Sequence, residues 1–284
     1  MNDQMVDILL SLVFFLVFRL LHAMILIYLE KQNCFPESLR NLDDTRLSVI
    51  RMPKGSPEDA EWSSMLISTF HSTFVIYFIF VFLGVEGHWT KEEIAYGTTA
   101  DLRILFDFSI GYFIHDSLLM FWWRMENWEI MTFHHLVAAT PYMVYNFVLG
   151  CYGGLYILTL FLLVEICTIP LNLKYFFEKH GFGSKPVTIS FYCTIISWIP
   201  CRLVLPIYNL VILYTVVIPL WWSEKSHWQF GVCVMPSVTA AHIITLFCWG
   251  VFFAKWVPEL KDKWTRSDSQ VPIKRGTPHL LSEV

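Results

Sequence analysis

Six ionisable residues lie inside stretches of the chain that are otherwise apolar enough to cross a membrane. They are His71, Asp116, His134, His135, Glu165 and Arg202. A charged or imidazole side chain in hydrocarbon is energetically costly, so such residues usually face a protein interior, pair with one another or mark a functional path. Imidazole and carboxylate groups suit proton transfer, and a guanidinium suits an anionic group. Because the six fall on five different predicted helices, they predict a shared polar cavity.

The composition is that of a protein built largely inside a membrane. Of its 284 residues, 55% are hydrophobic and 15% are charged. The mean hydropathy of +0.51 is too high for a soluble domain of this size. Apolar runs of about 20 residues, long enough to cross a hydrocarbon core of about 30 Å, recur along the chain. We therefore expect an all-α, polytopic membrane protein with about seven transmembrane helices. The predicted spans are 5–29, 63–84, 102–124, 131–149, 151–174, 187–217 and 237–257.

Two of these boundaries need interpretation. The run 187–222 is interpreted as one long helix kinked near Pro200 and Pro206, because two short spans would place the basic C-terminal tail outside the cell. The run 130–174 is interpreted as a hairpin of two spans that turns within 146–154. The chain then divides into an N-terminal helix with a cytosolic loop (1–60), a helical domain (61–260) and a disordered cytosolic tail (261–284).

The positions of lysine and arginine predict the orientation of the chain. With these spans, 15 of the 20 basic residues fall in loops on one side of the membrane and three on the other, while Arg19 and Arg202 lie within spans. Cytosolic loops carry the excess of basic residues. We expect an N-terminus that is outside or lumenal and a cytosolic C-terminus, in the plasma membrane or the endoplasmic reticulum.

The same topology places the polar residues in one half of the bilayer. At 1.5 Å per helical residue, His71, Asp116 and Glu165 lie about 10–13 Å from the cytosolic ends of their helices, and the adjacent histidines about 5 Å from theirs. Neighbouring helical residues point about 100° apart, so His134 and His135 cannot both face one partner. One imidazole is expected to face the cavity, with Asp116 or Glu165 fixing its tautomer.

Each polar residue also has a simpler interpretation as an interhelical hydrogen bond that holds the bundle together. Arg202 either neutralises a buried carboxylate or binds an anionic headgroup or phosphate. We assign His134, His135 and Asp116 to catalysis, and His71, Glu165, Arg202 and Asn172 to substrate binding.

Neither a metal nor a cofactor is expected. The chain has one pair of adjacent histidines but lacks the HxxHH and HxxxH clusters of di-iron membrane enzymes. Its seven cysteines lie mostly within predicted spans and form no CxxC pair, so neither a disulfide framework nor a zinc site is predicted. A channel is disfavoured because no selectivity-filter loop or voltage-sensor array is visible. No nucleic-acid partner is expected.

Several short motifs follow one another along most of the chain. They are Trp62-Ser63, His71-Ser72, Gly111-Tyr112-Phe113 with Asp116, the run from Trp128 to His135, Leu163-Val164-Glu165-Ile166 and Cys201-Arg202-Leu203-Val204. In these motifs and their order, the chain resembles the TLC-domain family, which contains ceramide synthases, translocating-chain-associating proteins and an adaptor of the endoplasmic reticulum linked to neuronal ceroid lipofuscinosis. The resemblance covers 61–257. It implies a six-helix barrel with an additional N-terminal helix, enclosing a lipid-accessible cavity.

The chain does not resemble all members of that family equally. In ceramide synthases the double histidine serves amide formation between a long-chain base and an acyl-CoA, and a D-x-x-D pattern follows on the next helix. Here Glu165 stands near the first aspartate and Thr168 at the second. The motifs are more similar to those of the smaller TLC-domain proteins, the calfacilitin and membrane-fluidity group. That resemblance implies control of phospholipid acyl composition and membrane fluidity.

Three hypotheses for the function stay open. The first is a lipid-homeostasis protein that binds a phospholipid or acyl chain in its cavity, with acyl-CoA as the co-substrate if the double histidine catalyses acyl transfer. The second is a ceramide synthase-like N-acyltransferase. The third is a non-enzymatic lipid sensor or cargo adaptor of the endoplasmic reticulum. The C-terminal Ser282-Glu283-Val284 also matches the pattern that PDZ-type domains capture by strand addition.

Overall fold

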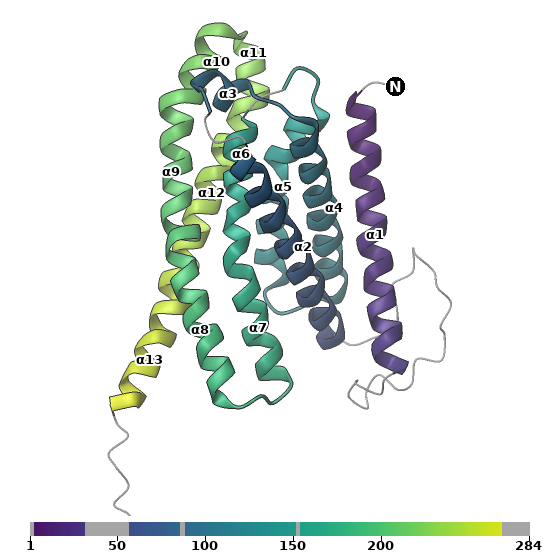
Figure 1. Ribbon diagram of the computed structural model, residues 1–284, viewed down its shortest axis with the longest axis vertical. Helices are drawn as coiled ribbons and strands as arrows, with labels where there is room; N and C mark the ends of the chain where they lie inside the picture. The colour runs from purple at the N-terminus through teal and green to yellow at the C-terminus, as the bar shows by residue number, and fades with distance from the viewer. Residues whose placement is uncertain (1–2, 32–56, 86–88, 152–153, 269–284) are drawn as a thin grey trace, which may run out of the picture.

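The computed structural model describes residues 3–31, 57–85, 89–151 and 154–268 (Figure 1). Most of the loop 30–62 and the C-terminal PDZ-type motif lie outside the described residues. Within the described ranges the chain is helical and contains no strand, which confirms the all-α prediction.

The described chain forms seven long helical runs. The first four are α1 (Asp3–Lys31), α2 (Pro57–Val85), α4 (Ala100–Trp123) and α5 (Trp128–Phe147), and a short helix α3 (Lys91–Tyr96) precedes α4. The fifth run joins α6 (Leu155–Leu162), a 3-10 segment η2 (Leu163–Cys167) and α7 (Thr168–Lys179). The sixth joins α8 (Ser184–Trp198), η3 (Ile199–Val204), α9 (Leu205–Ile212), η4 (Leu213–Val217) and α10 (Ile218–Glu224). The seventh joins α11 (His227–Gln229), η5 (Phe230–Val234), α12 (Met235–Val251), η6 (Phe252–Trp256) and α13 (Val257–Asp268).

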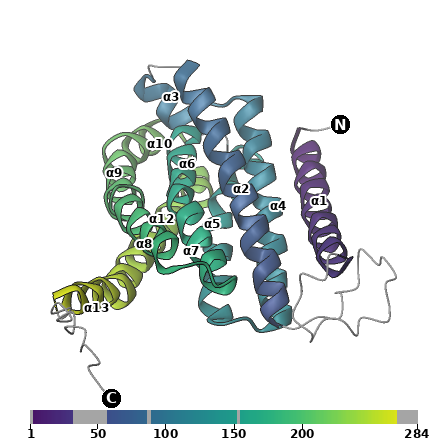
Figure 2. The same cartoon turned by 60° about the horizontal axis from the view of Figure 1, so that its bottom comes forward.

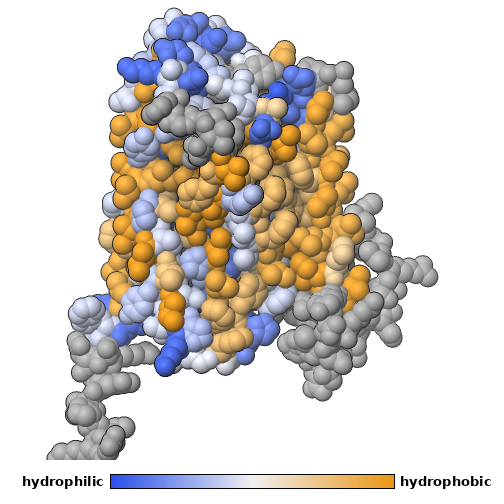
Figure 3. Space-filling view, viewed as in Figure 1, coloured by the Kyte–Doolittle hydropathy of each residue, from blue (hydrophilic) through white to orange (hydrophobic). Residues whose placement is uncertain are grey.

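Six of these seven runs are long and apolar enough to cross a membrane. The exception is α5, which carries the polar pair His134 and His135, yet its 20 residues extend about 30 Å and so can still span the hydrocarbon core. On the face drawn in Figure 3, hydrophobic residues form the middle of the bundle and hydrophilic residues gather at its two ends. The protein is an integral, multi-pass membrane protein.

The two interpreted boundaries agree with the structure. The sixth run is continuous over Ser184–Glu224, and π-helical turns occupy Ile199–Val204 and Leu213–Val217. Pro200 lies in the first of these turns, where a missing backbone N–H removes one rung of the hydrogen-bond ladder. The predicted hairpin is also present, because α5 ends at Phe147 and α6 begins at Leu155.

The predicted disordered tail begins too early and needs correction, because residues 261–268 continue helix α13. Contacts with the bundle hold this helix in place. Leu260 packs against the apolar cluster that contains Phe191, and the Lys263 amino group lies 4.7 Å from the centroid of the Phe191 ring. Glu259 lies 3.5 Å from the amino group of Lys174 on α7. The polar composition of the segment was therefore compatible with an anchored amphipathic helix.

Helix α4 is the central helix of the bundle. In its most apolar window 78% of the residues are buried, against 22–50% in the other five candidate spans. Helices α1, α2 and α5 pack around it, and the six runs from α2 onward form a barrel-like bundle with α1 beside α4 (Figure 2). We call the end that holds α3, α10 and the N-terminus the α3 end, and the opposite end the α7–α8 end (Figure 1).

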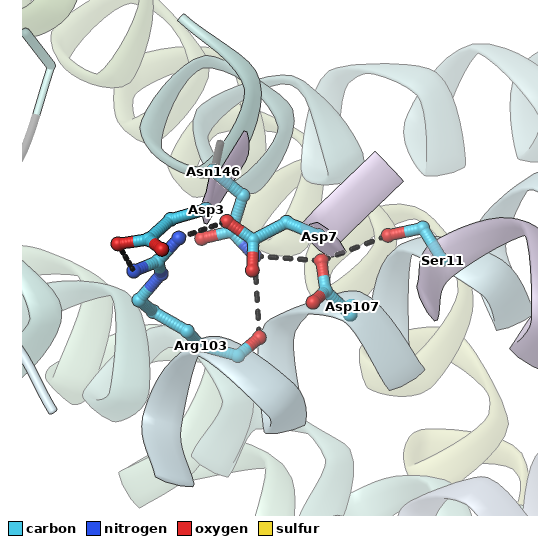
Figure 4. A network of polar contacts seen from close by, with 6 residues as sticks. All are labelled: Asp3, Asp7, Ser11, Arg103, Asp107 and Asn146. Carbon is cyan, nitrogen blue, oxygen red and sulfur yellow. Dashed lines mark hydrogen bonds and ion pairs between the residues drawn. The ribbon is translucent and has the colours of Figure 1, made fainter. Parts of the chain in front are cut away.

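At the α3 end, a buried polar network joins α1 to α4 and α5 (Figure 4). Arg103 of α4 forms an ion pair with Asp7 of α1. One turn further along α4, Asp107 accepts hydrogen bonds from Ser11 of α1 at 2.9 Å and from Asn146 of α5 at 2.8 Å. Because all three helices contribute a side chain, the network fixes where α1 lies on the bundle.

Halfway along α4, Gly111 allows α1 to approach closely. A Cβ atom at this position would lie 2.8 Å from Phe14 Cβ and 2.8 Å from the backbone nitrogen of Phe15. Just beyond, the fully buried Phe18 meets the ring of Tyr112 edge-on, with centroids 5.7 Å apart. Helix α1 is therefore packed as part of the bundle along much of its length.

The prediction that the cysteines form no disulfide is wrong. Cys151, in the turn after α5, is bonded to Cys233 in η5, and the two lie at the α3 end with a sequence separation of 82 residues. No short spacing motif marks this pair, because the hairpin and the last helical run bring the two residues together only in the folded bundle.

Candidate functional site

Asp116 occupies the centre of the cluster of polar residues in the bundle. Its side chain is 1% exposed. Ser64 of α2 donates a hydrogen bond of 2.5 Å to its Oδ1, and Tyr112, one turn earlier on α4, also hydrogen-bonds to the carboxyl group. Nδ1 of His135 on α5 lies 3.3 Å from Oδ2. Three helices thus place a side chain at one buried carboxyl group, and the imidazole of His135 lies close to it without forming a hydrogen bond through Nδ1.

His71 joins this cluster from α2. Its ring stacks on Tyr112 with centroids 4.0 Å apart, and its Nε2 lies 3.2 Å from the hydroxyl oxygen of Ser109. Phe18 of α1 meets the His71 ring edge-on, with ring centroids 6.5 Å apart. The side chain is fully buried, so His71 contacts neither the lipid nor the aqueous surface.

Glu165 and Arg202 form the second half of the cluster. Glu165 lies in η2, where Ser72 of α2 donates a hydrogen bond of 3.0 Å to its Oε2. Arg202, in the π-helical turn η3, donates to the carbonyl oxygen of Val164 at 3.3 Å and to the hydroxyl oxygen of Thr168 at 3.0 Å. Arg202 also interacts electrostatically with Glu165 at longer range. The guanidinium is thus held against η2, the same segment that carries the carboxylate.

A pocket opens beside this cluster, between α5, α6, η4 and α12. Its wall is mostly apolar, and His134 and Glu165 are its ionisable residues apart from the Tyr142 hydroxyl. A second hollow continues toward the α3 end and reaches the Cys151–Cys233 disulfide. The two hollows share Pro141, Ile157, Leu158, Leu213 and Ser237. The cavity is therefore polar at one end and apolar along the rest of its length.

The two adjacent histidines take different positions. His134 lines the pocket and stacks on Phe247 of α12, with ring centroids 4.5 Å apart. His135 turns instead toward Asp116, and the two imidazole centroids are 5.6 Å apart. The imidazole in the pocket wall is thus not the one beside the aspartate. The carboxylate that shares the pocket with His134 is Glu165.

Asn172 lies apart from the pocket wall. From α7 its side-chain amide donates to the carbonyl oxygen of Met65 at 3.1 Å and to the hydroxyl oxygen of Thr69 at 3.0 Å, both on α2. It therefore links two helices beside the cluster, in the way that polar side chains commonly join transmembrane helices.

Sequence reasoning missed several hydroxyl groups that complete the cluster. Ser64 and Ser72 hydrogen-bond to the two carboxylates, and Thr168 hydrogen-bonds to Arg202. A usable signal was present on α2, where Ser64, Ser68, His71 and Ser72 recur at the spacing of one helix face. In the described part of the chain, no group of three or more His, Cys, Asp or Glu side chains could hold a metal ion.

This arrangement can hold a hydrocarbon chain in the apolar part of the cavity, with a polar headgroup beside His134 and Glu165. It can also accept or donate a proton there, since imidazole is the side chain best suited to proton transfer near neutral pH. Among known proteins, a TLC-domain family model matches residues 61–257. No curated protein and no solved structure matches the chain. Because the matched segment covers more than half of the chain and contains the whole polar cluster, the chain belongs to the TLC-domain family.

Proposed function

We propose that this protein binds the acyl chain of a phospholipid or an acyl thioester in its intramembrane cavity, and thereby regulates phospholipid acyl composition and membrane fluidity. Membership of the TLC-domain family indicates a lipid-related function in the membrane. The observation that carries the finer proposal is the cavity itself, which is apolar along its length and ends on His134 and Glu165. Each methylene buried there contributes about 0.8 kcal/mol, so a long acyl chain would be held firmly by its tail.

The protein would be oriented with its α3 end outside or in a lumen. The disulfide between Cys151 and Cys233 lies at this end, and disulfides persist in oxidising compartments such as the lumen of the endoplasmic reticulum and the cell surface. Arg124 and Lys179 lie near the opposite, α7–α8 end. Cytosolic loops of membrane proteins carry the excess of basic residues, so this end is assigned to the cytosol. The polar end of the cavity is thus in the cytosolic half, where acyl-CoA is made and kept.

The polar end of the cavity also suits acyl transfer from an acyl-CoA. His134 would accept the proton of an amine or hydroxyl group as that group forms a bond to the thioester carbonyl carbon. The carbon–sulfur bond would then break, and the imidazolium would return its proton to the leaving thiolate, so that charge and protons balance. Glu165, in the same wall, would stabilise the transient imidazolium. His135, held beside Asp116, would support the position of α5 and of its neighbour.

Lipidomics of cells that lack the protein provides the first test. We expect wild-type protein to restore the phospholipid acyl profile and the double variant His134→Ala/His135→Ala to fail at equal abundance. His242→Ala is a matched control, since this α12 imidazole bonds to the Val238 carbonyl oxygen at 2.7 Å and does not line the pocket. Full rescue by the double variant would exclude a role of the double histidine.

Turnover is separated from binding with purified protein in nanodiscs. The protein is offered a labelled acyl-CoA with either a lysophospholipid or sphinganine as acceptor. A labelled phospholipid would support acyl transfer in phospholipid remodelling, and a labelled ceramide would support the N-acyltransferase alternative. Bound acyl chain without product would support a sensor or cargo adaptor. No retention of acyl chain at all would contradict the proposed use of the cavity.

A further inference from the structure

Three arginines of the described bundle are largely buried, and two of them have ion-pair or hydrogen-bond partners among the described residues. Arg103 pairs with Asp7, and Arg202 donates hydrogen bonds to η2 close to Glu165. Arg19 of α1 is 7% exposed, forms no ion pair with any described residue, and its Nη1 has no hydrogen-bond partner. A buried guanidinium without a counter-charge is unfavourable, so its partner is expected to come from outside the described chain.

Two imidazoles lie beside this arginine. His22 is three residues further along α1, which places it on the same helix face as Arg19. His115 projects from α4, and the His22 and His115 ring centroids are 5.8 Å apart. Arg19 interacts electrostatically with both rings. Both histidines are 1% exposed, and Nε2 of each lacks a hydrogen-bond partner within the described part of the chain.

Ser63 contacts one nitrogen of His22 and leaves the other free. Its hydroxyl oxygen lies 2.7 Å from Nδ1 of His22 and 3.0 Å from the carbonyl oxygen of Ala60. When the hydroxyl donates to Ala60, its oxygen accepts from a protonated Nδ1, and Nε2 is the free position. When an anion is present, Nε2 can bind a second proton and become a charged donor facing it.

The position of this cluster indicates the source of the anion. His22 lies nine residues, about 14 Å, from the last residue of α1, and Ser63 lies six residues, about 9 Å, from the first residue of α2, both at the α7–α8 end. On the outer face of α1, the apolar side chains of Leu16, Leu20 and Met24 are exposed, as expected for a surface that faces lipid. Arg19 is three residues deeper than His22, so the site lies about two to three helical turns inside these helix ends, and a lipid headgroup would reach it from the α7–α8 end.

We propose that Arg19, His22 and His115 bind the phosphate group of an anionic phospholipid. A guanidinium and imidazole N–H groups that gather with no carboxylate of the described residues paired to them suit the oxygens of a phosphate group. The site lies where α1 packs on α4, and none of its three residues lines the acyl-chain pocket. The bound lipid would join α1 to the TLC domain at the end opposite the Arg103 network. This proposal does not depend on the function proposed for the pocket.

The test is native mass spectrometry of the full chain released from nanodiscs of phosphatidylcholine alone or mixed with phosphatidic acid or phosphatidylserine. We expect wild-type protein to retain an anionic lipid in preference to phosphatidylcholine. Because Arg19→Gln removes a charge-assisted hydrogen bond, the preference should fall about tenfold, whereas Arg19→Lys should keep part of it. Arg124→Gln, which removes an exposed charge at the same end, is the matched control and should leave the preference unchanged.

Correct folding of each variant is judged by the intact Cys151–Cys233 disulfide and by elution as a single species. His115→Gln provides a second variant on the other helix if Arg19→Gln is not recovered folded, and it should also lower the preference. Equal retention of anionic lipid by wild type and both variants would overturn the proposal. A second result would also overturn it. If inorganic phosphate stabilised the wild-type protein in discs of phosphatidylcholine alone as much as the anionic lipid does, the site would bind a soluble anion.

Discussion

Gly111→Ala is the most direct test of how α1 is held against the bundle. A methyl group at this position would lie 2.8 Å from Phe14 Cβ, 2.8 Å from the backbone nitrogen of Phe15 and 3.0 Å from the carbonyl oxygen of Ser11. Two of these three atoms belong to the backbone of α1, so rotation of a side chain cannot relieve the overlap. The helix must instead move away from α4 by about 1 Å to restore ordinary contact distances.

The expected change in the free energy of unfolding of Gly111→Ala follows from two opposing effects. Overpacking a well-packed interface destabilises the folded state by about 1–3 kcal/mol. Replacing glycine by alanine inside a helix favours folding by about 1 kcal/mol, which hides part of that cost. Gly250→Ala in α12 separates the two effects, because a Cβ there meets nothing within 4 Å. The difference between the two variants should therefore be about 1–3 kcal/mol in the free energy of unfolding.

The assay is thermal unfolding of wild-type protein and both variants in the same lipid nanodiscs. We expect Gly250→Ala to melt at or above the wild-type temperature and Gly111→Ala to melt below it. A second readout is the lipid preference of the Arg19 site, which should weaken in Gly111→Ala because α1 shifts relative to His115. If Gly111→Ala melts together with Gly250→Ala, the close contact of α1 with α4 is not present in the membrane, and the reasoning is refuted.

The remaining predictions concern the disulfide, the cluster and the cavity. Cys151→Ser should lower the free energy of unfolding by about 2–4 kcal/mol through loss of the bond to Cys233, whereas Cys193→Ser, which replaces an exposed free thiol, should not. A thermal melt that is insensitive to both Cys151→Ser and reductant would contradict this. Arg202→Met should cost about 1–3 kcal/mol, because it removes the hydrogen bonds to the Val164 carbonyl and the Thr168 hydroxyl, and Arg202→Lys should recover part of the loss in the same melt. A melting temperature of Arg202→Met equal to that of wild type would show that the cation is dispensable. Ala240→Phe, which places a ring in the cavity wall, should reduce acyl-chain retention in nanodiscs with a stability cost of only about 1–3 kcal/mol. Unchanged retention by a folded Ala240→Phe protein would locate the acyl chain elsewhere.

Most of the helical framework could be predicted because a membrane imposes simple requirements on sequence. The apolar runs and the side preferred by basic residues together required a hairpin within 130–174 and one long helix through Pro200, and the structure has both. These features are encoded locally, by run length, by proline and by loop charge. Helix α13 was missed because its anchoring by Phe191 and Lys174 is a tertiary contact that polarity alone does not reveal.

The sequence predicts which residues form the candidate site, but not which of them contact one another. The sequence indicates that His134 and His135 cannot share one partner, yet it does not say which of them lines the cavity. That choice depends on the packing of α12, whose Phe247 stacks on His134, and on the rotation of α4, which directs Asp116 toward His135. The disulfide is invisible for the same reason, since its two cysteines meet only through the packing of helices remote in sequence.

The folded unit is larger than the segment that identifies the family. The matched residues begin at 61, but α1 contributes Asp7 as the counter-ion of Arg103, Phe18 as a ring contact of His71, and Arg19 beside His115. A chain without α1 would leave Arg103 without Asp7 and Asp107 with Asn146 but not Ser11 as its donor, and lost partners of buried polar groups are costly to replace. Because α1 touches the polar cluster through Phe18 and His71, occupation of the phosphate site and occupation of the cavity need not be independent. Acyl-chain retention measured with and without anionic lipid would reveal that coupling as a change in affinity, and equal affinities would show that α1 serves only to hold the bundle together.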